Sequence, residues 1–183
     1  MIFRIVALCF VSTILTAGQL ADFSGDLSGF RLSQNVHGLS MNHVTEQGKQ
    51  YLCLKGNAGP QLTYAELILK TPRQINTADK FEVETEIYIQ ESNRIIIVAL
   101  QFLDARGKIF VFDRGPLDKL SPGPHTLRYK FTPAAEKSSA SKGPMAFPIK
   151  FRGLSFLFKK TQTDSSHNSI CVKKVNLTKG GEE

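Results

Sequence analysis

The clearest pattern in the chain is an alternation of apolar and polar residues between positions 81 and 90. The segment FEVETEIYIQ carries its large apolar side chains at odd positions and its glutamates at even positions. Such a period of two is typical of a half-buried β-strand. It also fixes the register, because a shift by one residue would bury the glutamates. The apolar set is Phe81, Val83, Ile87 and Ile89, and the polar set is Glu82, Glu84, Glu86, Tyr88 and Gln90.

Two further strands are predicted directly after this one. Residues 94–104, RIIIVALQFLD, are apolar on both faces, which is typical of an interior strand covered on both sides. Asp104-Ala105-Arg106-Gly107 suits a type I turn that ends in a left-handed glycine and returns the chain as residues 108–113. With a short polar turn at 91–93, we expect the three strands to form one antiparallel meander, its middle strand inside the sheet.

Strands are also predicted on both sides of the meander. Residues 41–46 and 49–55 form a predicted hairpin across Gln47-Gly48. Residues 62–70 form another strand, which Thr71-Pro72 should end because proline has no N–H for the ladder. Residues 133–148, rich in Ala, Lys, Ser, Gly and Pro, are expected to be a mobile surface excursion. The remaining predicted strands are 125–132, 149–159 and 170–179, the last with a β-bulge at Lys173-Lys174.

The pattern therefore predicts about nine or ten strands and no helix. We expect an all-β fold, a two-sheet antiparallel β-sandwich of jelly-roll type. Residues 19–179 should form one domain, since their length is ordinary for a single core. Residues 180–183 are expected to be a disordered tail.

Residues 1–18 have the pattern of a secretory signal peptide. Arg4 is followed by a short apolar run and by the small residues Ala17 and Gly18. The run is shorter than the roughly 20 residues that a membrane-spanning helix needs, and no later segment suits a transmembrane span. We therefore expect cleavage after Gly18 and a secreted chain, extracellular or periplasmic.

Charge and cysteine content narrow the partners. The formal net charge is +7, but the basic residues are scattered, so a solvated exterior is favoured over an anionic surface or an acidic polysaccharide. Nucleic acid is not expected for a secreted chain. Cys53 and Cys171 remain after the leader is removed, and both have outward parity on predicted strands. They form either a disulfide, if those strands are neighbours, or two separate thiols.

The opening DFSGDLSGF, the strand YLCLKG, the strand FRGLSFLF and the closing ICVKKVNLTK resemble the galactose-binding-like jelly rolls. That group includes many non-catalytic carbohydrate-binding modules. The resemblance covers about residues 22–179 and implies glycan binding. It also implies a structural calcium between the opening segment and the last strand. Here Lys173 and Lys174 stand at the matching last-strand positions, and a lysine cannot ligate calcium, so we expect no cofactor. Weak binding of calcium by surface oxygens elsewhere stays open as an alternative. Asp22 or Asp26 is expected to pair with one of these lysines.

A candidate ligand site is predicted on the non-core face of the meander. Tyr88 and Gln101 are expected on adjoining strands, and an aromatic ring with planar hydrogen-bonding groups is the chemistry that a sugar needs. The absence of Trp and the presence of only four Tyr weaken this expectation, since such modules stack sugars on aromatic rings. The predicted site is Tyr88, Gln101, Glu86, Arg128 and Arg152.

Three functions remain open at this point. The leading hypothesis is a secreted, non-catalytic domain that binds a polysaccharide or a glycoprotein through one sheet face. The second is a jelly-roll glycosidase or polysaccharide lyase that uses Glu84 and Glu86, whose spacing along a strand is about 7 Å. The third is a structural or protein-interaction domain without a small ligand. The four histidines show no zinc spacing, so no metal site is predicted.

Overall fold

The computed structural model describes residues 18–34, 39–57, 63–75, 80–90, 95–117, 119–132, 138, 140–158 and 167–179. These residues form strands and turns, without a helix. Of the predicted leader only Gly18 lies among them, and the predicted tail lies outside them. The strands are β1 (Gly18–Asp22), β2 (Phe30–Gln34), β3 (Ser40–Glu46), β4 (Lys49–Asn57), β5 (Thr63–Ile75), β6 (Phe81–Ile89), β7 (Ile95–Leu103), β8 (Ile109–Asp113), β9 (Gly123–Phe131), β10 (Ile149–Phe158) and β11 (His167–Lys179).

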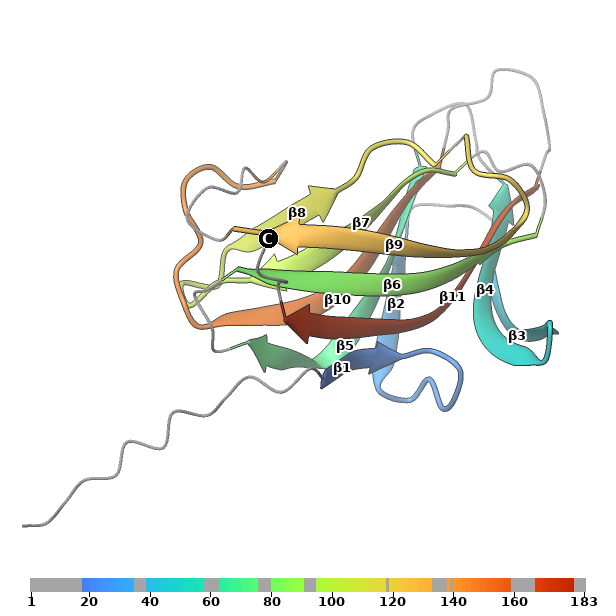
Figure 1. The fold of residues 1–183 in the computed structure, drawn as a ribbon, viewed down its shortest axis with the longest axis horizontal. Helices are drawn as coiled ribbons and strands as arrows, with labels where there is room; N and C mark the ends of the chain where they lie inside the picture. The colour runs from blue at the N-terminus through green and yellow to red at the C-terminus, as the bar shows by residue number, and fades with distance from the viewer. Residues whose placement is uncertain are drawn as a thin grey trace, which may run out of the picture.

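The strands make two antiparallel sheets, which confirms the predicted β-sandwich. Sheet A has the order β3-β4-β11-β6-β9, with β1 paired to β11, and sheet B has the order β2-β5-β10-β7-β8. In Figure 1, β9, β6 and β11 form the layer nearest the viewer and cross in front of β8, β7 and β10. Every described pairing joins antiparallel neighbours, many of them far apart in sequence.

The alternation of β6 places its side chains as predicted. Phe81, Val83, Ile87 and Ile89 are buried between the sheets, and the even positions are half-buried on the outer face. Val98, Leu100 and Phe102 of β7 face them from sheet B. Aromatic rings join the two layers, with Phe131 of β9 packing edge-on against Phe102 at a centroid distance of 5.3 Å. The core is thus built from the inward faces of both sheets, as in other sandwiches.

One buried polar contact also joins the sheets. The hydroxyl of Tyr129, on β9, donates a hydrogen bond to the carbonyl oxygen of Val98, on β7, at 2.8 Å. Burial raises the pKa of Tyr129 far above its ordinary value. The hydroxyl therefore stays protonated and remains a donor to the other sheet.

The predicted meander is wrong at its first connection. β6 pairs with β11 and β9, whereas β7 pairs with β10 and β8, so the chain passes from sheet A to sheet B between them. Alternation shows which residues face inward, but it does not show which strands are partners. The second half of the meander is correct: the turn from β7 to β8 carries Gly107 at φ 76°, with its N–H donating to the carbonyl of Asp104 at 2.9 Å.

The predicted β3–β4 hairpin and the bulge in β11 are confirmed. The hairpin turn has positive φ at both Gln47 and Gly48, as type I′ turns require. The register of β11 against β6 shifts between Val172 and Lys174. The expected end of a strand at Thr71-Pro72 is wrong, because β5 continues to Ile75. Pro72 is tolerated because it lies in a bulge, where no ladder partner on β10 needs its missing N–H.

The described part of the predicted mobile excursion is tied to the sandwich. The hydroxyl of Ser138 accepts a hydrogen bond from the backbone N–H of Val111, and the hydroxyl of Ser141 donates to the carbonyl of Ile109. Both bonds satisfy backbone groups of β8, the last strand in the order of sheet B. Met145 is buried in the core. Ser138 and Ser141 therefore occupy two backbone groups at the edge of sheet B, which would otherwise be available to another chain.

Candidate functional site

The structure separates the five predicted site residues into two groups on opposite faces. Tyr88 and Glu86 on β6 lie with Arg128 of β9 on sheet A, and Gln101 of β7 lies with Arg152 of β10 on sheet B. The prediction that Tyr88 and Gln101 adjoin is wrong, because it depended on the pairing of β6 with β7. The predicted residues therefore do not form one site but lie on two faces of the sandwich.

The outer face of sheet A carries cross-strand ion pairs. Arg128 lies opposite Glu84 in the register, and its Nε is 2.9 Å from Glu84 Oε1. Lys174 Nζ is 3.0 Å from Glu86 Oε1, and Lys173 Nζ is 3.9 Å from the other oxygen of Glu86. The carboxylates considered as catalytic acids thus face cations from neighbouring strands. Pairs of this kind stabilise an exposed sheet face modestly.

Tyr88 belongs to a small apolar cluster on the same face. Its ring lies 5.5 Å from the ring of Tyr51, and both pack beside the disulfide that joins Cys53 to Cys171, together with Val44. Tyr51 is buried, which raises the pKa of its hydroxyl, and the nearby charge of Glu86 acts in the same direction. A hollow of about 170 Å³ lies beside this cluster, lined by Lys49, Tyr51, Glu86, Ile87, Pro124, His125 and Thr126.

A polar network occupies the centre of the outer face of sheet B. The side-chain amide of Gln101 donates to Glu66 Oε1 at 2.6 Å and also to the hydroxyl of Ser155. Its carbonyl oxygen accepts a hydrogen bond from the guanidinium of Arg152, whose Nη1 lies 3.9 Å from Glu66 Oε2. Gln101 is only 1% exposed and Ser155 is buried. The network therefore fixes a carboxylate, an amide, a hydroxyl and a guanidinium on one sheet surface.

The strand pairing explains this arrangement. Ser155 lies opposite Glu66 on β5 and opposite Ala99 on β7, so alternate residues of three adjacent strands point to the same face. Gly153, opposite both Ile68 and Gln101, has a φ of 153°, and a Cβ there would lie 2.0 Å from the carbonyl oxygen of Leu67. Only glycine fits at this position, because any side chain would meet the backbone of β5.

A bulge next to Gly153 produces a hollow beside the network. One residue of β10, Arg152, opposes the four residues of β5 from Leu69 to Pro72, between the paired positions Ile68 and Arg73. A bulge bends its strand and redirects side chains. The hollow has a volume of about 320 Å³, and the side chain of Arg152 in its lining is 13% exposed. Its lining is Arg31, Ile68, Leu69, Lys70, Pro72, Leu103 and Arg152.

Tyr64 supplies an exposed ring on this face. It lies on β5 two residues before Glu66, opposite Leu157 of β10, and is 41% exposed. Residue-level sequence reasoning missed Tyr64, Glu66, Ser155 and Arg31. A signal existed for two of them, because Glu66 in YAELIL and Ser155 in GLSFLF are single polar residues inside apolar strand segments. A buried polar side chain at such a position requires a polar partner.

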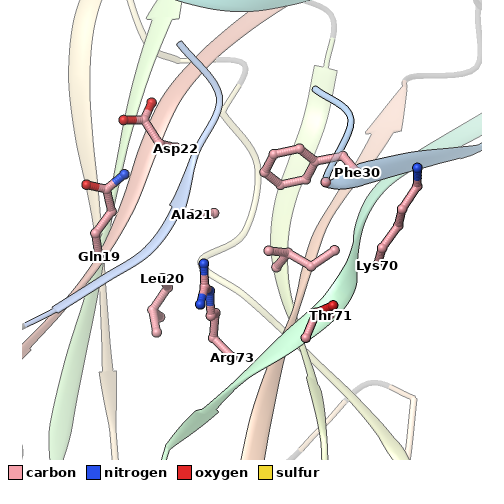
Figure 2. Close-up of a pocket in the computed structure, with 10 residues that line it drawn as sticks. Gln19, Leu20, Ala21, Asp22, Phe30, Lys70, Thr71 and Arg73 are labelled. Carbon is pink, nitrogen blue, oxygen red and sulfur yellow. The ribbon is translucent and has the colours of Figure 1, made fainter. Parts of the chain in front are cut away.

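A second, larger hollow lies at the edge of the sandwich between β1 and the bulged part of β5. Its volume is about 620 Å³, and Figure 2 shows Arg73 reaching into it from β5, with Phe30 and Lys70 on the other side. Gln19 and Asp22 point away from Arg73, on the far side of β1. Leu69 and Lys70 line this hollow and also the hollow on sheet B. The two hollows are therefore adjacent, with the β5 bulge between them.

The described residues contain no group of three or more His, Cys, Asp or Glu side chains that could hold a metal ion. At the place where the resemblance implies calcium, Asp22 accepts hydrogen bonds from the backbone and hydroxyl of Ser24, at 2.9 Å and 2.6 Å. Burial raises the pKa of Asp22, whereas these hydrogen bonds and the charge of Lys173 lower it. The lowering is the larger effect, so the pKa lies below its ordinary value. Lys173 and Lys174 form their ion pairs with Glu86, and not with Asp22 or Asp26 as predicted. These pairs join β11 to β6.

In the described part of the chain, no helix is both long and apolar enough to cross a membrane. No protein-family model matches the sequence. A search of curated proteins gives no match either.

Solved structures with the same fold include carbohydrate-binding modules and enzymes that contain similar domains. A Family 11 carbohydrate-binding module from Clostridium thermocellum, in complex with a β-1,3-1,4-mixed-linked tetrasaccharide, superposes with a TM-score of 0.59 at 12% identity, over 91% of this chain and 98% of that one. An exo-β-agarase gives a TM-score of 0.58 at 8% identity, over 91% of this chain and 26% of that one.

The CBM22-1–GH10 segment of Clostridium thermocellum xylanase 10B, complexed with xylohexaose, gives a TM-score of 0.54 at 7% identity, over 88% of this chain and 28% of that one. Identities this low establish the architecture alone. The chain has the β-sandwich fold of carbohydrate-binding modules, as its sequence resemblance implied.

Proposed function

We propose that this protein is a secreted, non-catalytic carbohydrate-binding domain that holds a glycan on the outer face of sheet B. The observation that carries the proposal is the network of Glu66, Gln101, Ser155 and Arg152, in which Gln101 and Ser155 are buried and the other two are half-buried, set beside a hollow and an exposed tyrosine. This modifies the predicted site: Gln101 and Arg152 are retained, and Tyr88, Glu86 and Arg128 are left to the other face.

The chemistry of this face suits a sugar. A sugar ring presents hydroxyls that both donate and accept, and a flat C–H surface that packs on an aromatic ring. Glu66 offers acceptors, Arg152 offers donors, and Tyr64 offers an exposed ring on the same strand as Glu66. Because Gln101 already holds Glu66 and Arg152 in place, a ligand would not have to order these side chains on binding.

The structural neighbours support the same class of ligand. The Family 11 module was solved with a bound tetrasaccharide and the xylanase segment with xylohexaose. Both share the sandwich architecture over most of this chain.

The enzymatic alternative receives less support from the geometry. Glu84 pairs with Arg128 and Glu86 pairs with Lys174, both across the exposed face of sheet A. A glycosidase needs two carboxyl groups placed around a bound glycosidic bond. The hollow beside Glu86 measures only about 170 Å³. We therefore assign no catalytic residues.

Secretion is the compartment that agrees with the covalent structure. Cys53 and Cys171 form a disulfide, and disulfides persist in oxidising compartments such as the extracellular space and the bacterial periplasm. A polysaccharide or a glycoprotein is the partner that such a compartment offers to a glycan-binding domain.

The proposal is tested by measuring the binding of the purified protein to a glycan array and to soluble polysaccharides by calorimetry. The variant Tyr64→Ala removes the exposed ring of sheet B, and we expect it to weaken binding about tenfold. The control Arg128→Ala changes the face of sheet A, where the side chain is 63% exposed, and should leave the affinity unchanged.

An assay of reducing ends, added to these binding measurements, separates the alternatives. Release of reducing ends from a polysaccharide, abolished in Glu84→Gln or Glu86→Gln, would replace the proposal with an enzymatic function. If the protein binds none of the glycans tested, the structural or protein-interaction domain is favoured. Binding that Arg128→Ala weakens and Tyr64→Ala does not would move the site to sheet A.

A further inference from the structure

We propose that the glycan held on sheet B is an acidic polysaccharide, whose carboxylate or sulfate groups bind a cationic band formed by Arg31, Lys70, Arg73 and Arg152. This inference rests on the proposed glycan-binding function and specifies its ligand class.

The hollow on sheet B has an unbalanced lining. Arg31, Lys70 and Arg152 contribute cationic groups to it, whereas its other described lining residues, Ile68, Leu69, Pro72 and Leu103, are apolar. Arg31 and Lys70 are exposed. Arg152 is largely covered, and its guanidinium is held by Gln101 and Glu66. A fixed guanidinium at the base of a hollow and two exposed cations beside it form a setting for an anionic group.

The positive charge continues around the edge of the sandwich. Lys70 lines both hollows, and Arg73 reaches into the second one, between β5 and β1 (Figure 2). The carboxylate of Asp22 near this hollow points away from Arg73 and accepts hydrogen bonds from Ser24. The β5 bulge therefore carries cations on both of its sides. A path over two adjacent hollows suits an extended polymer with repeated charges better than a single small anion.

Three acidic side chains near the band, Asp22, Glu66 and Asp26, reduce its charge without cancelling it. Glu66 lies 3.9 Å from Arg152. The pKa of Asp26 is lowered, first by hydrogen bonds from Ser28 and to a smaller extent by the charge of Lys70. With Asp22, whose carboxylate points away from Arg73, three carboxylates stand against four cations, so the band remains positive.

An uncharged glycan would not balance this band. A polymer lying over Arg31, Lys70 and Arg152 removes water from their charged groups, and such desolvation is costly unless an opposite charge replaces the water. Carboxylates and sulfates provide that charge, and the fork of an arginine matches their oxygen geometry. Affinity should therefore depend on the acidic groups of the polymer and on the ionic strength.

The test titrates the full protein with polygalacturonate, with dextran sulfate, and with two neutral polymers, mixed-linked β-1,3-1,4-glucan and xylan. Each titration is made at about 0.1 M and about 1 M salt, since the screening length falls from about 10 Å to about 3 Å over this range. The variants are Arg31→Ala/Lys70→Ala and, separately, Arg73→Ala. These side chains are exposed, and circular dichroism checks that the variants fold. Arg128→Ala, on sheet A, is the control with the same loss of one charge as Arg73→Ala.

We expect at least one acidic polymer to bind about tenfold more tightly than both neutral polymers at low salt, and to lose this advantage at high salt. The double variant should weaken that binding about tenfold and Arg73→Ala by less, whereas Arg128→Ala should not change it. Preference for polygalacturonate or for dextran sulfate identifies the acidic group.

Other outcomes overturn the inference in distinguishable ways. Equal or tighter binding of a neutral polymer, unaffected by the double variant, would remove the acidic ligand class and leave the proposed function standing. Binding to none of the polymers would remove both. Binding to vesicles of phosphatidylcholine and phosphatidylserine, without binding to any polymer, would assign the band to an anionic membrane surface instead.

Discussion

Cys53 and Cys171 lie directly opposite each other on β4 and β11, and their disulfide joins positions 118 residues apart in the sequence. Each half of the bridge lies on the outer face of sheet A, covered by Tyr51 and Tyr88. The bond thus fastens the hairpin of β3 and β4 to the last strand of the domain.

Removal of this disulfide should destabilise the fold strongly. In the chain-entropy model, a bridge that closes a loop of this length contributes about 5 kcal/mol to the free energy of unfolding. We expect the double variant Cys53→Ser/Cys171→Ser to lose a large part of this contribution, as measured by denaturant titration. Wild-type protein in reductant is the control, and it should unfold like the double variant. Equal stability of the oxidised wild type and the double variant would show that the bridge contributes nothing.

Asp104 should make the stability depend on pH. Its buried carboxylate accepts hydrogen bonds from the backbone N–H groups of Arg106 and Lys108, each at 2.9 Å, and from the guanidinium of Arg106. Burial raises the pKa of Asp104, but the bonds from Lys108, Arg106 and Ala146 outweigh it, so the pKa in the folded state lies below its ordinary value of 3.8.

A lowered folded-state pKa means that the ionised carboxylate stabilises the fold above the unfolded pKa, and that this stability is lost as the pH falls through the folded value. Asp104→Asn should cost about 2 kcal/mol at neutral pH. The difference between wild type and variant should shrink as the pH falls below the ordinary value of 3.8. A difference that stays constant below this value, in unfolding titrations at each pH, would contradict the assignment.

Replacing Thr85 should stabilise the fold, whereas the preceding substitutions should destabilise it. Its side chain is 0% exposed on the inward face of β6, and its hydroxyl has no hydrogen-bond partner among the described residues. A buried hydroxyl without a partner is costly. We expect Thr85→Val to raise the free energy of unfolding by about 1 kcal/mol. Thr126→Val, at an exposed position on β9, is the control and should change it by less; a loss of stability in Thr85→Val would mean that the hydroxyl is satisfied.

Gly153 should tolerate no side chain. A Cβ at this position would lie 2.0 Å from the carbonyl oxygen of Leu67, and its φ of 153° is unfavourable for other residues. We expect Gly153→Ala to destabilise the fold by about 3 kcal/mol and to weaken glycan binding, because Gln101 is its neighbour on β7. Gly25→Ala, where a Cβ meets nothing within 4 Å, is the control. An alanine variant with unchanged stability and binding would contradict the role given to the bulge.

The sequence predicted the layers of this fold better than their connections. The alternation in 81–90 was sufficient to place Val83 and Ile87 in the core and Glu84 on the surface. The alternation does not show which strands pair. The pairing of β6 with β11 joins residues such as Glu86 and Lys174, which are far apart in the chain. The predicted site mixed two faces for this reason alone.

The bulges were only partly predictable. The change of parity in the last strand revealed the bulge between Val172 and Lys174. The prediction that a strand ends at Pro72 was wrong, because β5 continues past it. A proline can end a strand or lie in a bulge, and the neighbouring strand determines which of the two occurs. The hollow beside Arg152 follows from that bulge, so no local pattern could show it.

The most direct test of the glycan site on sheet B is a nuclear magnetic resonance titration of the isotope-labelled protein. Galacturonate oligosaccharides and mixed-linked glucan oligosaccharides are added in turn, and the side-chain amide of Gln101 and the backbone amides of both sheets are followed. With at least one of the two ligands, we expect saturable shifts at Gln101, Glu66 and Ser155 of sheet B and none at Glu84 or Arg128 of sheet A. Shifts confined to sheet A, or no saturable shift with either ligand, would contradict the proposed site.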